Sequence, residues 1–112
     1  MIKKTLPACP VETTLTLIGD KWKAIIIRDL LDGTKRFGEL QKSIGISQKV
    51  LTQHLRAMEA DGLVKRKVYA QVPPKVEYSL TETGKSLETV LEAMKQWGIS
   101  YKAKLAGRGK PA

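Results

Sequence analysis

The sequence predicts a mostly helical α+β fold, a single domain of five helices and one small β-hairpin. Two observations predict it. Apolar residues recur every three or four positions in five segments, which is typical of helices, and they alternate with a period of two only between residues 63 and 80. The chain has 112 residues, of which 42% are hydrophobic, and this is enough for one domain with its own core.

The first two helices are expected near the N-terminus, after an arm formed by residues 1–9. The first helix, over residues 10–18, begins with a proline and carries apolar side chains one turn apart. Asp20 is a good N-cap for the second helix, and Gly33 is a good stop for it.

A third and a fourth helix, joined by a tight turn at Gly45, are expected to form a helix-turn-helix. The third helix is short and covers residues 37–44. Ser47 is a good N-cap for the fourth, which is expected over about residues 47–61, and Gly62 suits its C-terminal end. This second helix of the pair is the candidate recognition helix.

The period of two over residues 63–80 predicts a β-hairpin, the wing, whose loop is stiffened by two prolines. Residues 34–36 could add a short third strand. Thr81 is expected to cap one long final helix over residues 81–106, followed by a flexible basic tail at 107–112. The result is a winged helix-turn-helix in residues 10–106, with an extra N-terminal helix and a long C-terminal helix.

Several function classes are excluded by composition. One cysteine and one histidine cannot form a disulfide within the chain or a Cys₄ or Cys₂His₂ zinc site. No catalytic signature and no phosphate-binding glycine loop is present, so we expect neither an enzyme nor a cofactor. The longest aliphatic run, residues 24–27, is far shorter than the ~20 residues that a membrane span needs. We therefore expect a cytoplasmic protein with no membrane partner.

The net charge of +9 is concentrated in the middle of the chain. Residues 35–78 hold nine basic and four acidic residues, a net +5. A solvated surface is one explanation, and a polyanion partner is the other. The outward positions of the fourth helix favour DNA, because Gln and Arg can read adenine and guanine in the major groove. The candidates for major-groove contacts are Ser47, Gln48, Lys49, Thr52, Gln53 and Arg56. His54 lies between the inner and outer faces, where a packed or surface role is expected, with a DNA contact as the alternative ahead of a metal ligand.

The hairpin is expected to supply mainly phosphate contacts, along the backbone or in the minor groove. Those candidates are Lys35, Arg36, Lys65, Arg66, Lys67, Gln71 and Lys75. For Lys65 and Lys67 singly, the alternative is the solvent face of an edge strand, where lysine discourages aggregation.

Nine sequence blocks resemble the HxlR-type family of bacterial winged helix-turn-helix transcriptional regulators, over about residues 9–101. They are CPVE at 9–12, IGDKW at 18–22, LDG at 31–33, RFGEL at 36–40, GISQKVLT at 45–52, EADGL at 59–63, VPP at 72–74, VEYSLT at 76–81 and WG at 97–98. The resemblance implies a homodimer that binds pseudo-palindromic promoter DNA as a repressor or an activator. A winged-helix module that binds protein or RNA is the alternative function.

The first and last helices carry more apolar surface than one small domain needs, which agrees with a dimer. The expected interface residues are Val11, Leu15, Ile18, Met94, Trp97, Tyr101 and Leu105. Two-fold pairing would place the recognition helices ~34 Å apart, about one DNA turn. The alternative is that the core of the monomer consumes this stripe.

Cys9 matches the position at which several members of the family sense oxidants or electrophiles. The following helix N-terminus and the nearby Lys3 and Lys4 favour a thiolate. Because the chain has no second cysteine, a disulfide would need another molecule. The alternative is a small buried hydrophobic residue.

Overall fold

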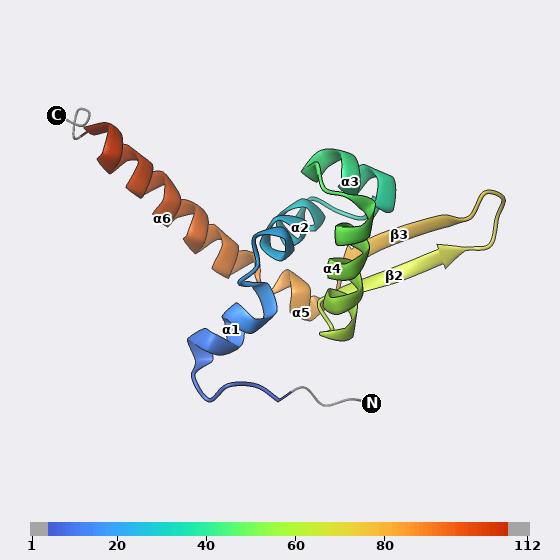
Figure 1. Cartoon of the computed structure of the whole chain (residues 1–112), viewed down its shortest axis with the longest axis horizontal. Helices are drawn as coiled ribbons and strands as arrows, with labels where there is room; N and C mark the ends of the chain where they lie inside the picture. The colour runs from blue at the N-terminus through green and yellow to red at the C-terminus, as the bar shows by residue number, and fades with distance from the viewer. Residues whose placement is uncertain (1–4, 108–112) are drawn as a thin grey trace.

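The computed structural model describes residues 5–107 and contains a small helical body from which a hairpin and one long helix project in opposite directions (Figure 1). The expected arm and tail lie partly outside the described residues. The elements in chain order are α1 (Pro10–Ile18), α2 (Lys21–Leu31), β1 (Lys35–Arg36), α3 (Phe37–Ile44), α4 (Gln48–Ala60), β2 (Val64–Tyr69), β3 (Lys75–Leu80), α5 (Glu82–Lys85) and α6 (Glu88–Gly107). The predicted mostly helical winged fold is therefore confirmed.

Local signals in the sequence fix where the helices begin and end. The Asp20 carboxylate accepts a hydrogen bond from the backbone N–H of Trp22 at 2.7 Å and so caps α2. Ser47 caps α4 in the same way, by accepting from the N–H of Val50 at 3.2 Å. The helix-turn-helix bends at Gly45, whose φ of 74° lies in the left-handed region that glycine tolerates best.

The sheet has three antiparallel strands in the order β1-β3-β2, so β2 is an edge strand. In its register Val64 faces Leu80, and Arg66 faces Tyr78. The two-residue β1 pairs with β3 and confirms the third strand.

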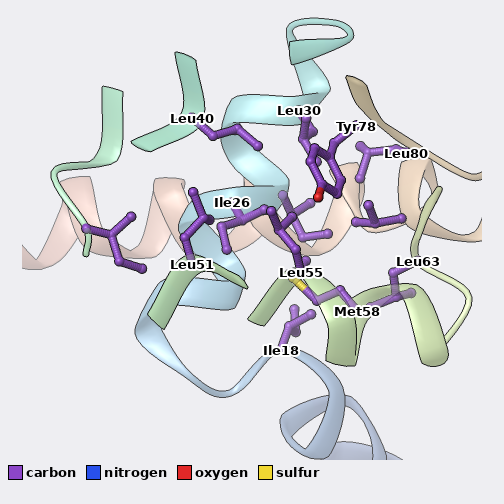
Figure 2. Packing of buried hydrophobic residues seen from close by; sticks show 13 residues of the cluster. Ile18, Ile26, Leu30, Leu40, Leu51, Leu55, Met58, Leu63, Tyr78 and Leu80 are labelled. Carbon is purple, nitrogen blue, oxygen red and sulfur yellow. The ribbon is translucent and has the colours of Figure 1, made fainter. Parts of the chain in front are cut away.

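The hydrophobic core lies between α2, α3, α4 and the base of the sheet (Figure 2). Its most buried side chains include Ile26 of α2, Leu40 of α3, and Leu51, Leu55 and Met58 of α4. This core fixes the orientation of α4, because its inner face is held by three large side chains one turn apart.

The expectation of one continuous helix over residues 81–106 is wrong. Thr81 does act as an N-cap, accepting from the N–H of Gly84 at 3.0 Å, but α5 ends after one turn and α6 starts at Glu88. Gly84 is buried, and a Cβ added there would overlap the carbonyl oxygen of Leu63. The short α5 therefore packs against the start of the wing, and α6 runs from there in another direction (Figure 1).

Candidate nucleic-acid interface

The outward face of α4 is polar. Its buried stripe of Leu51, Leu55 and Met58 faces the core, so the remaining positions point away from it. Of the residues expected to contact bases, Ser47, Gln48, Lys49, Gln53 and Arg56 are exposed and Thr52 is half-buried. The structure thus places all six outside the buried stripe of one helix.

His54 packs at the junction between α4 and α2. Its Nε2 lies 3.7 Å from Oδ1 of Asp20, the residue that caps α2. The side chain is largely buried and does not belong to the outward face of α4. Within residues 5–107, no group of three His, Cys, Asp or Glu side chains is placed to hold a metal ion.

The wing distributes its basic residues over two faces. Side chains alternate along a strand, so Lys65, Lys67 and Tyr69 share one face of β2 and Arg66 lies on the other. Lys65 lies at the base of the wing, where it lines a recess with Lys85. It therefore stands apart from the basic residues nearer the tip, and its contact with a phosphate stays a prediction, with the solvent face of an edge strand as the alternative.

Two lysines gather around Tyr69 toward the tip of the wing. The Nζ atoms of Lys67 and Lys75 lie 4.9 Å and 4.6 Å from the centre of its ring. The Tyr69 hydroxyl donates a hydrogen bond of 2.9 Å to Glu77, which also pairs with Lys75 at 3.3 Å. This hydrogen bond first, and then Lys75, lowers the pKa of the Glu77 carboxyl. The cluster holds two cations at fixed positions on an exposed hairpin.

The tip of the wing approaches the beginning of α3. Arg36, Gln71 and Lys75 line a common recess of about 290 Å³ there. Lys35 is half-buried in β1. The structure therefore brings three of the expected backbone-contacting residues together, with Arg36 contributed from outside the hairpin.

The face of β2 opposite Lys67 turns toward α4. Nε of Arg66 lies 3.9 Å from Oε1 of Glu59, which stands one turn after Arg56 on α4. Sequence reasoning missed Glu59, although an acid three residues after Arg56 in a basic segment is a visible signal. Arg66 is therefore the wing residue that connects to α4.

A second exposed surface is apolar and lies on α1 and α6. Among the described residues of α6 none is buried, and its large hydrophobic side chains that are exposed include Met94, Trp97, Tyr101 and Leu105. The rings of Trp97 and Tyr101 stack in parallel, with their centres 5.2 Å apart. Val11 and Leu15 of α1 are exposed as well, and so is Ile99, which the sequence reasoning did not include.

Ile18 does not belong to this surface. It is only 3% exposed and packs in the core of the monomer, so its expected place in a dimer interface is wrong. The spacing of apolar residues along the first helix could not separate a core contact at its last turn from exposed positions earlier on.

Cys9 precedes α1 and is exposed. The alternative that it is buried in the core of the chain is therefore wrong.

None of the helices in the part of the chain that the structure describes is long and apolar enough to cross a membrane.

A winged helix-turn-helix with a polar, outward-facing second helix and a basic wing is typical of the class of helix-turn-helix transcriptional regulators. Residues 17–106 match the model of the HxlR-like helix-turn-helix family. The HTH-type transcriptional regulator YdeP of Bacillus subtilis is 56% identical over 98 residues, which cover 87% of this chain and 77% of YdeP. The chain therefore belongs to the HxlR-like helix-turn-helix family, whose members are transcriptional regulators and not enzymes.

Solved structures agree with this assignment. The reduced form of the redox regulator HypR superposes with a TM-score of 0.82 at 52% identity, covering 88% of this chain and 99% of that chain. The reduced form of YodB from B. subtilis superposes with a TM-score of 0.72 at 41% identity, covering 81% of this chain and 91% of that chain.

Proposed function

We propose that this regulator binds pseudo-palindromic promoter DNA in the cytoplasm as a homodimer, with α4 in the major groove and the wing against the adjacent backbone and minor groove. The observation that carries the proposal is the outward polar face of α4. Gln53 and Arg56 there are exposed donors on a helix whose other face is fixed by the core. Because the core fixes the orientation of this helix, the same set of side chains would face the base edges whenever α4 enters a major groove.

The wing supplies the sequence-independent part of the binding. Lys67 and Lys75 are held around Tyr69, and Arg36 lines the same recess as Lys75. Cations at fixed positions on an exposed hairpin are suited to phosphates, which position a protein on DNA without reading its sequence. Lys35 and Gln71 are proposed as additional contacts to the DNA backbone, after these three residues.

The apolar surface of α1 and α6 supports the homodimer. An exposed stripe of this kind on a small domain marks an interaction site. α6 has 20 residues, about 30 Å at 1.5 Å per residue, and it projects from the body (Figure 1). A second copy that packs its own α6 and α1 against this helix would bury the stripe and set the spacing of the two recognition helices.

Gly98, in the middle of α6, fits the same arrangement. A Cβ added at this position would meet no atom of residues 5–107 within 4 Å, so no contact among them requires a glycine here. Glycine costs a helix interior about 1 kcal/mol relative to alanine. Close approach of a second helix is a physical reason to keep it.

A selection of binding sites from random duplex DNA tests the proposed function. We expect an enriched motif with two related halves, about 10 base pairs from centre to centre. Failure to enrich any motif, together with capture of RNA or of a protein by the face formed by α4 and the wing, would instead support a winged-helix interaction module.

Regulation by an oxidant is a second proposal, and it rests on Cys9. The thiol is exposed and lies at the start of α1, next to the apolar surface proposed for the dimer. HypR, which this chain resembles, is a redox regulator, and YodB has been solved after diamide treatment. Oxidation of Cys9 to a disulfide with a second thiol, from another molecule, would change the packing of α1 against a second copy. Promoter affinity should change on diamide treatment of the wild type but not of Cys9→Ser, and an unchanged wild type would rule the sensor out.

A further inference from the structure

Glu59 is an acidic side chain inside a basic interface. It lies on α4 one turn beyond Arg56, and its Oε1 is 3.9 Å from Nε of Arg66 on the wing. Both side chains of this ion pair are partly open to solvent, with 42% of Glu59 and 48% of Arg66 exposed. The pair therefore spans the junction between the two elements proposed to contact DNA.

Other acids of the same segment have a structural role. Glu39 accepts a hydrogen bond from the backbone N–H of Arg36 at 2.7 Å, at the start of α3. Glu77 accepts one from Tyr69 at 2.9 Å within the wing. The Glu59 carboxylate makes no such hydrogen bond with any residue between 5 and 107. Its position at the junction is thus not explained by the folding of α4.

The junction is a recess of about 160 Å³ in which three charges converge. Its lining comes from α4 and the sheet, and consists of Thr52, Leu55, Arg56, Glu59, Arg66 and Tyr78. Burial raises the pKa of the Tyr78 hydroxyl, and the charges of Arg66, Glu59 and Arg56 all act on it. Two guanidinium groups and one carboxylate therefore surround the same small space.

The recess is lined by residues of both α4 and the sheet, so a DNA backbone that contacts Arg56 and Arg66 together would lie next to it. Guanidinium groups bind phosphates strongly, often through two hydrogen bonds. A solvent-exposed ion pair is weak, so a phosphate can displace Glu59 from Arg66. The displaced carboxylate then remains close to the phosphate and repels it.

We propose that Glu59 limits the sequence-independent affinity of this protein for DNA. Its charge offsets one of the two guanidinium groups at the junction of α4 and the wing, so that backbone attraction alone holds the protein weakly. Base contacts from the outward face of α4 then decide which sites are occupied. This inference rests on the proposed DNA-binding function and identifies a residue that tunes it.

The test compares Glu59→Gln with the wild type on a selected operator and on a random duplex of the same length, over a range of salt concentrations. Glutamine keeps the size of the side chain and removes its charge. We expect Glu59→Gln to bind both duplexes three- to tenfold more tightly at about 0.1 M salt, and to steepen the slope of log K against log salt by about 0.9. Sequence preference should stay unchanged.

Two control variants separate this effect from net charge and from geometry. Glu82→Gln removes one negative charge from α5, where the side chain is 95% exposed and pairs with Lys85. We expect it to change the affinity by less than about twofold, because Glu82 does not line the recess and its exposed charge is largely screened. Glu59→Asp keeps the charge with a shorter side chain and should keep the wild-type salt slope.

Several outcomes would overturn the proposal. These are an unchanged affinity and slope in Glu59→Gln, an equal effect of Glu82→Gln, or a steeper slope in Glu59→Asp. A changed sequence preference in Glu59→Gln would make Glu59 a base-reading residue instead. The Nε–H resonance of Arg66 tests the ion pair without DNA: it should move in Glu59→Gln but not in Glu82→Gln, and an unmoved resonance also overturns the proposal. A wild type that binds neither duplex would refute the DNA-binding function, which is a separate result.

Discussion

Truncation of Trp97 tests the proposed dimer surface most sharply, because this residue is 68% exposed in the monomer. A tryptophan offers up to about 250 Å² of surface, so roughly 170 Å² is available for burial by a second copy. At about 25 cal/mol per Å², full burial is worth ~4 kcal/mol and half burial ~2 kcal/mol for each tryptophan. Since each dimer contains two copies, half burial already gives about 4 kcal/mol.

We expect Trp97→Ala to raise the dimer dissociation constant by roughly a thousandfold, because about 1.4 kcal/mol corresponds to a factor of ten. Sedimentation equilibrium over a range of concentrations measures this constant. Trp97 lies outside the buried core, so the fold of the monomer, followed by circular dichroism, should be unchanged. Val72→Ala is the matched control, since Val72 is 99% exposed at the tip of the wing. Equal dimerisation of Trp97→Ala and the wild type, or an equal loss in Val72→Ala, would refute the reasoning.

Five further substitutions test the interface and the fold. Arg56→Ala should relax base preference at one position of a selected site by about 1–3 kcal/mol. Lys67→Ala should instead weaken binding to all duplexes alike and lower the slope of log K against log salt by about 1. Competition binding against single-base variants of the site separates the two effects. Tyr69→Phe removes the main cause that lowers the pKa of Glu77, so that pKa should rise toward 4.5 in a carboxyl NMR titration. Because a lowered carboxyl pKa stabilises the fold only above that pKa, the advantage of the wild type over Tyr69→Phe should be present at neutral pH and shrink as the pH falls below 4.5. Gly84→Ala places a Cβ against the Leu63 carbonyl and should cost more than about 2 kcal/mol in urea unfolding, while Gly98→Ala should leave the stability of the monomer equal or higher.

The helices were predictable where a local signal sets their ends. Asp20 and Ser47 cap α2 and α4 through hydrogen bonds to residues two or three positions away, and such signals are complete within a short stretch of sequence. The end of α5 is different, because it depends on the contact of Gly84 with Leu63, which lies 21 residues earlier in the chain. Residues 85–88 alone give no indication that the helix breaks there.

The sequence predicted which face of α4 belongs to the candidate interface, but not the contacts between α4 and the wing. A period of 3.6 identifies the side of α4 that carries Gln53 and Arg56, because the buried residues leave only one other side. The approach of Arg66 to Glu59 depends on how the sheet packs against α4, and the separation of Lys65 from Lys67 and Lys75 depends on the register and on α5. Long-range packing of this kind is not encoded in the spacing of charged residues.

Methylation interference on a selected duplex tests the central claim, that a dimer places two copies of α4 in successive major grooves. The N7 atoms of guanine lie in the major groove, so methylation there should block binding wherever α4 reads bases. We expect two clusters of interfering guanines on one face of the duplex, centred about 10 base pairs apart. A single cluster, or no interference in the major groove, would contradict the claim.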